Sequence, residues 1–192
     1  LLPFIHYSIH CINKARLEGC NIQILMKASA YIQAIYIAPM AGAPMESVMD
    51  AELVGSGIQG DRYAINKGAY SDTSPSKIRH ISLITAAGIE TANEWLMADN
   101  EPIFSGAETR RNVVLANMSA DELNQLVGQT FYLGELLLKG VELCTPCQRP
   151  AQLQNKPNFM EAFEGRGGLR AEILQVGTIS VGDVLQLNSK EA

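Results

Sequence analysis

Alternation of apolar and polar positions is the main pattern along this chain. In residues 31–38, β-branched and aromatic side chains fall at alternate positions, which is typical of a strand with one buried face. The apolar phase of residues 136–144 shifts at Lys139 and Gly140, which predicts a bulge or a tight turn. Similar patterns predict strands at residues 47–54, 80–84, 112–116, 131–133, 136–144, 169–175, 179–181 and 184–187.

Helical periodicity is confined to short segments. Thr85 is a predicted N-cap, and Ile89 and Leu96 share one face of the helix that would follow it. Residues 119–122 have the form of a capping box, and residues 158–161 predict the start of another brief helix. Many short strands with few, scattered helices predict a mainly β fold, a β-barrel rather than an array of βαβ units.

A cluster of glycines at residues 55–60 matches the G-x-G-x-x-G pattern of dinucleotide-binding sites. Such a site needs a helix that starts within the pattern and an acidic residue about 20 positions later. Here a long polar loop, residues 64–79, follows almost directly. We interpret the glycine cluster as a turn that needs positive φ, and the loop as a segment of the kind that often carries function.

Composition and charge describe a folded protein. The chain has 192 residues, of which 47% are hydrophobic and 18% charged, as in globular rather than disordered proteins. The formal net charge of −5 argues against a nucleic acid as the main partner. Four cysteines are too few for a disulfide scaffold, so we expect a reducing, cytoplasmic environment.

The beginning of the chain differs from the rest. Charged residues interrupt the apolar stretches of the first 25 positions, so neither a signal peptide nor a membrane helix of ~18 apolar residues is predicted, and we expect no membrane partner. Met26, Lys27 and Ala28 resemble an ordinary protein start. We therefore expect residues 1–25 to be an N-terminal extension outside the domain, and residues 26–192 to form a single domain.

The segment Cys144-Thr145-Pro146-Cys147 carries the strongest chemical signal. A predicted strand delivers two thiols to a loop that is stiffened by proline and lies beside Arg149. The thiolate is the reactive form of cysteine, and a nearby guanidinium stabilises it. Cys147 is therefore the first candidate for a catalytic residue and a metal ligand, whereas Cys144 fits a small buried side chain equally well.

This C-x-x-C segment admits three functional interpretations. One is a single thiolate that ligates a metal or carries sulfur. Another is a thioredoxin-like dithiol, which needs a helix to start at the motif; Pro150 and the absence of a βαβ pattern disfavour it without excluding it. The third is structural zinc, for which a second ligand pair is available only from Cys11, Cys20, His6 and His10.

Basic residues gather in the predicted loops and at strand starts. Arginine is suited to planar, bidentate recognition of phosphate, and a site would form if the fold brought these loops together. Taken singly, each reads as a solvated surface charge. Asp61 fits a partner that orients one of them. The group comprises Arg62, Lys77, Arg79, Arg110, Arg111, Arg149, Arg166 and Arg170.

Five segments, in order along the chain, resemble the MOSC domain, a module at the C-terminus of molybdenum cofactor sulfurases and in small stand-alone bacterial proteins. The likeness spans residues 31–187, and the ordered series makes it specific. The segments are GIQGDR at 57–62, RHISLI at 79–84, TRRNVVL at 109–115, DELNQLVGQTFYLGELLLKGVELCTPC at 121–147 and RGGLRAEILQVGTISVGD at 166–183.

The resemblance implies a MOSC-type β-barrel, mostly antiparallel, and a cysteine that carries sulfur or ligates the molybdenum of a pterin cofactor. That cysteine falls on Cys147, and a soft thiolate suits both roles. Asp61 and Asn112 are expected to hold the geometry of the loops. The residues expected to bind the cofactor, molybdopterin with its molybdenum, are Arg62, Arg110, Arg111, Arg166 and Arg170, with Asp61 and Asn112 in support.

The resemblance also implies a function. We expect a stand-alone MOSC protein that binds molybdenum cofactor, or carries sulfur for it or for a cofactor-dependent enzyme. Reduction of N-hydroxylated compounds is one activity within this expectation, and it would need a redox partner. Pyridoxal phosphate is not expected, because the aminotransferase-like domain of the fused enzymes is missing. The alternatives are a non-catalytic barrel that binds a phosphorylated ligand or a partner enzyme, and a C-x-x-C dithiol redox protein.

Overall fold

The computed structural model describes residues 28–188, and the strands of this part of the chain form two sheets. The strands of the larger sheet follow one another as β11-β7-β8-β9-β5-β6-β1-β2, and those of the smaller sheet as β10-β3-β4. In chain order they are β1 (Tyr31–Ile37), β2 (Glu46–Val48), β3 (Asp50–Val54), β4 (Gly57–Ile58), β5 (Ile81–Thr85), β6 (Val113–Ala116), β7 (Thr130–Leu133), β8 (Leu136–Leu143), β9 (Leu169–Ile173), β10 (Gly177–Ser180) and β11 (Leu185–Leu187).

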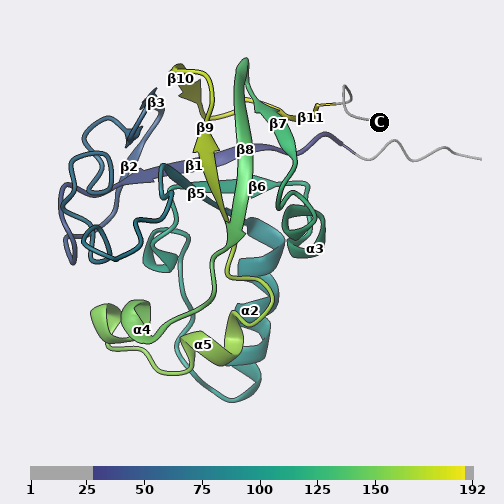
Figure 1. Cartoon of the computed structure of the whole chain (residues 1–192). Coiled ribbons are helices and arrows are strands. Elements are labelled where there is room, and N and C mark those ends of the chain that lie inside the picture. Colours follow the sequence, from purple (N-terminus) through teal and green to yellow (C-terminus); the bar gives the residue numbers. More distant parts are fainter. Residues whose placement is uncertain (1–27, 189–192) are drawn as a thin grey trace, which may run out of the picture.

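The larger sheet is mixed and curls into a half-barrel (Figure 1). Strands β5 and β6 run parallel, whereas neighbours such as β7, β8 and β9 are antiparallel. Backbone bonds also join the start of β1 to the segment before β11: Ile32 N donates to Asp183 O at 2.8 Å, and Leu185 N to Ala30 O at 2.8 Å. The predicted fold class, mainly β and mostly antiparallel, is confirmed.

The alternating pattern has the expected physical cause, because one face of the sheet is buried. In β9, Leu169, Ala171 and Ile173 are buried and the two residues between them are only partly so. They belong to the main core, inside the curl of the sheet. A second core lies on the other face of the sheet and includes the buried face of α2. In it, the Phe104 ring packs edge-to-face against Phe159 and Phe163, and the rings of Phe159 and Phe163 are stacked.

Between residues 28 and 188, five helical segments accompany the strands: α2 (Ala86–Ala98), η1 (Ala107–Thr109), α3 (Ala120–Asn124), α4 (Gln148–Gln154) and α5 (Phe159–Ala162). The Thr85 side chain accepts from Gly88 N at 3.0 Å, which confirms the predicted N-cap of α2. The capping box between Ser119 and Glu122 is also present. Helix α5 begins after Asn158 as predicted, although the Asn158 side chain makes no capping hydrogen bond.

Helix α4 is a departure from the sequence prediction, which takes Pro150 as unfavourable to a helix after the C-x-x-C segment. Cys147 is the N-cap of α4, and Pro150 is the third residue of the helix. Proline is tolerated in the first turn because a backbone N–H there has no intrahelical acceptor. Pro150 is therefore compatible with this helix.

Three local predictions can be compared with the structure directly. Gly57 and Gly60 have positive φ, and turns lie on both sides of the two-residue strand β4, so the interpretation of the glycine cluster as a turn segment is confirmed. The pairing of β8 with β9 shifts register between Gly140 and Glu142, which confirms the predicted irregularity. The strand predicted at 47–54 is divided into β2 and β3 at Met49.

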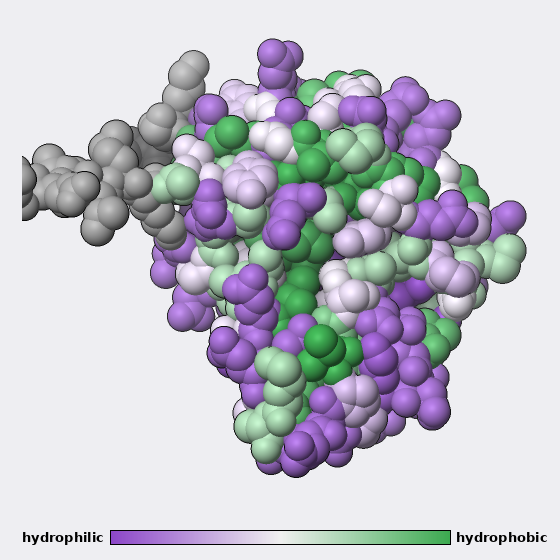
Figure 2. Space-filling model, turned by 180° about the vertical axis from the view of Figure 1, so that it is seen from behind, coloured by the Kyte–Doolittle hydropathy of each residue, from purple (hydrophilic) through white to green (hydrophobic). Residues whose placement is uncertain are grey.

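The surface seen from behind Figure 1 carries a band of apolar side chains between polar ones (Figure 2). Within residues 28–188, no helix has the length and apolarity that crossing a bilayer requires. The expected extension at residues 1–25 and the possible zinc ligands Cys11, Cys20, His6 and His10 lie outside the described residues. The division of the chain at residue 25 therefore stays a prediction.

Candidate functional site

Residues from several segments surround a cavity of about 80 Å³ at one end of β8. Most belong to the C-x-x-C segment with the start of α4, the turn and long loop between β4 and β5, the residues that lead into β6, and the start of β9; Ala41 after β1 and Ile81 and Ser82 of β5 complete the lining. The volume is several times the ~10–15 Å³ that one water needs, so it has room for a small anionic group. The arginines that line it are Arg62, Arg79, Arg110, Arg111, Arg149 and Arg170, together with Cys147, Tyr63 and Tyr70.

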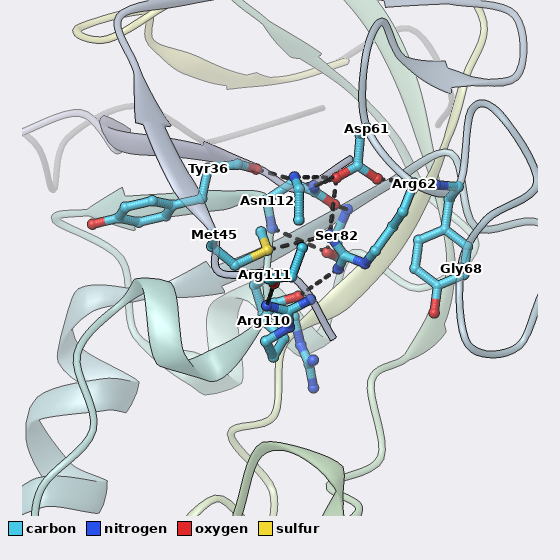
Figure 3. A network of polar contacts seen from close by, with 12 residues as sticks. Tyr36, Met45, Asp61, Arg62, Gly68, Ser82, Arg110, Arg111 and Asn112 are labelled. Carbon is cyan, nitrogen blue, oxygen red and sulfur yellow. Dashed lines mark hydrogen bonds and ion pairs between the residues drawn. The ribbon is translucent and has the colours of Figure 1, made fainter. Parts of the chain in front are cut away.

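Asp61 is the buried anion below this cavity, with 1% of its surface exposed. Its Oδ2 accepts hydrogen bonds from Ala38 N at 3.1 Å, Arg62 Nη1 at 2.9 Å and Asn112 Nδ2 at 3.2 Å. Its Oδ1 accepts from Tyr63 N at 3.1 Å. A buried charge is tolerated only when paired and hydrogen-bonded, and Asp61 meets both conditions (Figure 3).

Asn112 joins three segments through one amide (Figure 3). Besides Asp61, its Nδ2 donates to Tyr36 O at 3.1 Å on β1. Its Oδ1 accepts from Ser82 N at 3.2 Å and from Ser82 Oγ at 2.8 Å on β5. Because both donor and acceptor capacity are in use, the residue must be an amide, and it holds the base of the cavity together.

Arg62 is used mainly by the scaffold. Its Nη1 bonds Asp61 and lies 3.2 Å from Met45 Sδ, and its Nη2 donates to Arg110 O at 3.1 Å. The guanidinium also lies 5.1 Å from the centroid of the Tyr63 ring. With most donors committed to the protein, Arg62 positions the loop around it more than it offers charge to a ligand.

Arg110 brings a positive charge into a buried position. It is 8% exposed, its backbone is left-handed with φ of 65°, and its Nη1 donates to Ala43 O. Burial, followed by repulsion from Arg62 and Arg149, lowers the pKa of Arg110 to about 10. Arg110 is still protonated at neutral pH, and a bound anion would offset the cost of burying it.

Arg111 connects the arginine group to the C-x-x-C segment. Its Nε donates to Gly167 O at 2.6 Å and its Nη1 to Thr109 O at 3.2 Å. A Cβ at Gly167 would lie 2.1 Å from the Cys144 carbonyl oxygen. Gly167 is therefore pressed against the segment that bears the thiols, and Arg111 holds it there.

Carboxylates compensate only part of this positive charge. Glu142 pairs with Arg170 Nη1 and, at 2.9 Å, with Lys77 Nζ. The hydrogen bond from Lys77, together with the one from Arg170, holds the pKa of Glu142 below its ordinary value, although partial burial acts in the opposite sense. Four of the lining arginines form no ion pair with a carboxylate of residues 28–188: Arg79, Arg110, Arg111 and Arg149.

The two cysteines are in different environments. Cys144 is 3% exposed, and its backbone N donates to Gly168 O at 2.7 Å. Cys147 is partly exposed, and both cysteines line the cavity. The Tyr70 hydroxyl donates to Cys147 Sγ at 3.8 Å. This hydrogen bond, followed by partial burial, raises the pKa of Tyr70.

Arg79 is the arginine whose inner atoms lack partners. Its guanidinium lies 5.4 Å from the centroid of the Tyr70 ring. Its Nε and Nη1 are buried, and no group within residues 28–188 hydrogen-bonds them. Buried donors are normally satisfied, so these two nitrogens are available to acceptor atoms of a ligand or to water.

The structure brings together all but one of the site residues predicted from the sequence. Arg166 lies elsewhere: its Nη1 donates to Ala162 O at 2.6 Å, and it lines a separate hollow with Gly88 and Ser119. Asp61 lies directly below the cavity through its bond to Arg62. The predicted residues that line the cavity are Cys147, Arg62, Arg110, Arg111, Asn112 and Arg170. Their roles toward a cofactor stay predictions.

Four further arginine and tyrosine residues line the cavity and are not among the residues predicted to bind the cofactor. Arg149 is predicted only to stabilise the thiolate, from its place two positions after Cys147. Arg79 belongs to the group of loop arginines, and no pattern in the sequence distinguishes it from the others. Tyr63 and Tyr70 lie in or beside a loop without periodicity, so no pattern in the sequence points to them.

A cofactor with a soft metal and a phosphate fits part of this chemistry. Within the described residues, no three His, Cys, Asp or Glu side chains gather to hold a metal. Of the two cysteines that line the cavity, Cys147 is the partly exposed one and would offer its thiolate to a metal. The orphaned nitrogens of Arg79 and the uncompensated arginines fit a phosphate. The cavity has room for such a group, and the rest of a larger ligand would extend outside it.

Comparisons with known proteins were made for the family, the sequence and the fold. A model of the MOSC domain matches residues 72–186. A search of curated protein sequences finds no match.

Solved structures with a similar fold come from several bacteria. YuaD from Bacillus subtilis has a TM-score of 0.65 and 20% identity over 82% of this chain and 94% of that one. YiiM from Geobacillus stearothermophilus has a TM-score of 0.63 and 16% identity over 84% of this chain and 76% of that one. YiiM from Escherichia coli has a TM-score of 0.58 and 16% identity over 87% and 72%. At these identities the likeness shows the fold alone.

Proposed function

Because the chain belongs to the MOSC domain family, we propose that it binds molybdenum cofactor, or carries sulfur for it, through Cys147. One observation carries this proposal: a partly exposed thiol shares a cavity with six arginines, four of which have no carboxylate partner among the described residues. A thiolate is a soft ligand that suits molybdenum or a persulfide. Guanidinium groups suit a phosphate.

Each part of the site would have a distinct task. Cys147 offers its sulfur as a single ligand or as the atom that bears a second sulfur. Arg79, Arg110 and Arg111 offer N–H groups and positive charge to a phosphate, and Arg149 adds to them. Asp61 and Asn112 hold the surrounding loops in place. The cofactor, when bound, supplies the redox chemistry of its metal.

One activity consistent with this proposal is the reduction of N-hydroxylated compounds. The protein would orient the substrate next to the metal and shield it from water. A separate redox partner would have to deliver electrons, because the sequence contains no flavin or Fe–S motif. The exposed mouth of the cavity, where Tyr70 is 39% exposed, is the side on which such a substrate would enter.

The proposal is tested by metal and sulfur analysis of protein purified from a cell that makes molybdenum cofactor. Wild type should contain molybdenum, or sulfur that cyanide releases as thiocyanate. Cys147→Ser should lose it, whereas Cys144→Ala, which alters the buried thiol, should keep it. A wild-type protein with neither molybdenum nor releasable sulfur would overturn the proposal.

A dithiol redox protein is the second candidate, and helix α4 favours it. Because Cys147 is the N-cap of α4, the C-x-x-C segment does precede a helix, as a thioredoxin-like motif requires. This function needs a reversible disulfide between Cys144 and Cys147. Thiol counting by mass spectrometry would then show that two thiols are lost on mild oxidation and regained on reduction. If the Cys144 and Cys147 thiols stay free after mild oxidation, this candidate is excluded.

A further inference from the structure

The Cys147 sulfur has a cover that comes from a distant part of the chain. Tyr70, 77 positions earlier, places its hydroxyl 3.8 Å from Cys147 Sγ. Its ring lines the cavity, and 39% of the residue is exposed to solvent. Tyr70 therefore lies at the exposed side of the cavity, next to the partly exposed thiol.

Local hydrogen bonds hold the loop around Tyr70 in shape. Thr73 Oγ1 donates to Tyr70 O at 3.1 Å, and Gly68 N donates to Ser71 Oγ at 3.0 Å. A Cβ at Gly68 would lie 2.3 Å from the Tyr63 ring, so the loop packs directly on that ring. These contacts fix the backbone on both sides of Tyr70.

The side chain of Tyr70 is held from its face as well. The Arg79 guanidinium lies 5.4 Å from the ring centroid, a distance at which a cation attracts an aromatic face. Near Arg79, Lys77 is tied to Glu142 of β8 at 2.9 Å. The end of the loop is thus anchored to the sheet, and the Tyr70 side chain is held with its hydroxyl beside the sulfur.

We propose that Tyr70 sets the size of the molecule that can reach the Cys147 sulfur. With the ring in place, the cavity of about 80 Å³ admits a slender group, and a bulky one must displace Tyr70 first. The surrounding donors, the Tyr70 hydroxyl and the uncompensated arginines, select acceptor-rich, anionic groups. The class of partner is therefore a small anion, or a narrow anionic end of a larger ligand.

This inference deepens the proposed function and rests on it in one respect, the identity of Cys147 as the working sulfur. Tyr70 adds a limit on the size of the ligand to the preference for anions that the arginines provide. Tyr63 also lines the cavity, but its ring lies against Arg62 at 5.1 Å. Among the aromatic residues that line the cavity, only Tyr70 is hydrogen-bonded to the thiol.

The test compares two reagents with the same electrophile and different sizes, N-ethylmaleimide and N-(1-pyrenyl)maleimide. Modification of Cys147 is followed by peptide mass spectrometry, because the chain has four cysteines. In wild type the pyrenyl reagent should react at least tenfold more slowly than the ethyl reagent. Tyr70→Ala should reduce this ratio about tenfold, chiefly by accelerating the pyrenyl reaction.

Matched variants separate cover from hydrogen bonding. Tyr70→Phe keeps the ring and loses the hydroxyl, so it should keep the wild-type ratio. Arg79→Ala removes the contact that holds the ring, and it should shift the ratio in the direction of Tyr70→Ala. Tyr132→Phe, on β7 and outside the cavity, should change neither rate. A ratio that is the same in Tyr70→Ala and wild type would overturn the inference.

The outcome can be told apart from that of the proposed function, because the maleimide rates need neither molybdenum nor a persulfide. If wild type holds neither molybdenum nor releasable sulfur but the reagent ratio falls in Tyr70→Ala, the role of Tyr70 is supported and the proposed function is overturned. Protein that holds molybdenum or releasable sulfur, but whose ratio is unchanged in Tyr70→Ala, would lose the cover alone.

Discussion

Asn112 donates a hydrogen bond from Nδ2 to Asp61 Oδ2 at 3.2 Å across 51 positions of sequence. Both side chains are almost fully buried, at 3% and 1% exposed. Through this contact the turn after β4 is fixed to the residue that precedes β6. Arg62, Arg110 and Arg111 flank the two residues in sequence, so the bond sets where three of the lining arginines stand.

Replacing Asn112 with Asp should destabilise the protein strongly. The change puts a second carboxylate beside Asp61 and removes the donor to Tyr36 O. An uncompensated buried charge costs about 3–5 kcal/mol, and we expect a loss of that order in the free energy of unfolding measured with urea. Gln186→Glu, at an exposed residue of β11, should change it by less than about 0.5 kcal/mol. Equal stability of the two variants would contradict the assigned role of Asn112.

A methyl group at Gly167 should disturb the C-x-x-C segment directly. The added Cβ would lie 2.1 Å from the Cys144 carbonyl oxygen and 3.2 Å from the Pro146 ring, so backbone must move. Overpacking of this kind costs about 1–3 kcal/mol. We expect Gly167→Ala to lower the free energy of unfolding by that amount and to reduce the molybdenum or sulfur content.

Gly55→Ala is the matched control for Gly167→Ala. A Cβ at Gly55 meets nothing within 4 Å, and the substitution should leave both stability and content near the wild-type values. Chemical denaturation and metal analysis of the two variants side by side provide the comparison. A Gly167→Ala protein as stable as Gly55→Ala would show that the segment can shift without cost.

The sequence predicts the antiparallel strands well because alternation reports a single buried face, as in β9. It does not predict that β5, α2 and β6 form a βαβ unit. The two strands and the helix are each predicted, but their local patterns do not say which strands pair or in which direction. The burial of both Val113 and Val114, one in each core, shows that β6 is covered on both faces, as is typical of strands in a βαβ unit.

The candidate site divides in the same way. Cys147 and Arg149 are predictable because they are neighbours within one motif, and Arg110 and Arg111 because they precede a strand. Tyr70 reaches the thiol only through the course of a loop without periodicity, which no local pattern encodes. Arg166 shows the converse, since a family motif contains it while its guanidinium bonds to Ala162 O of α5.

Stability should depend on pH through His80. Partial burial lowers the pKa of His80 below its ordinary value of 6.5, although Glu172 acts in the opposite sense. The His80 Nδ1 accepts from Ile173 N at 3.2 Å, as only the neutral ring can. Below pH 6.5 the unfolded chain therefore binds a proton that the folded one does not, and stability falls as pH drops.

The variant His80→Asn tests this dependence, because the amide oxygen replaces the Nδ1 acceptor and does not titrate. The difference in unfolding free energy between wild type and variant should shrink between about pH 7 and pH 5, with a slope of at most about 1.4 kcal/mol per pH unit. Urea unfolding at several pH values measures it. A difference that stays constant over this range would exclude His80 as the source.

The uncompensated arginines should make the protein bind phosphate. A ligand that binds only the folded state raises stability by RT ln(1 + [L]/Kd), about 1.4 kcal/mol at tenfold excess over Kd. We expect phosphate to raise the melting temperature of wild type, and Arg79→Gln to abolish most of that rise, because its buried Nε and Nη1 have no protein partner within residues 28–188. Lys139→Gln, an exposed residue of β8, removes the same charge and should retain the effect.

Two further variants decide what the anion site serves. Arg166 lies outside the cavity, so the geometry predicts that Arg166→Gln keeps the response to phosphate, whereas the family motif predicts its loss. Cys147→Ser leaves the arginines in place and should respond like wild type. If that variant also retains its natural ligand, the protein is a phosphate-binding barrel in which the thiol has no part. If phosphate stabilises Cys147→Ser while molybdenum and releasable sulfur are gone, the arginines bind the phosphate and Cys147 holds the molybdenum or the releasable sulfur.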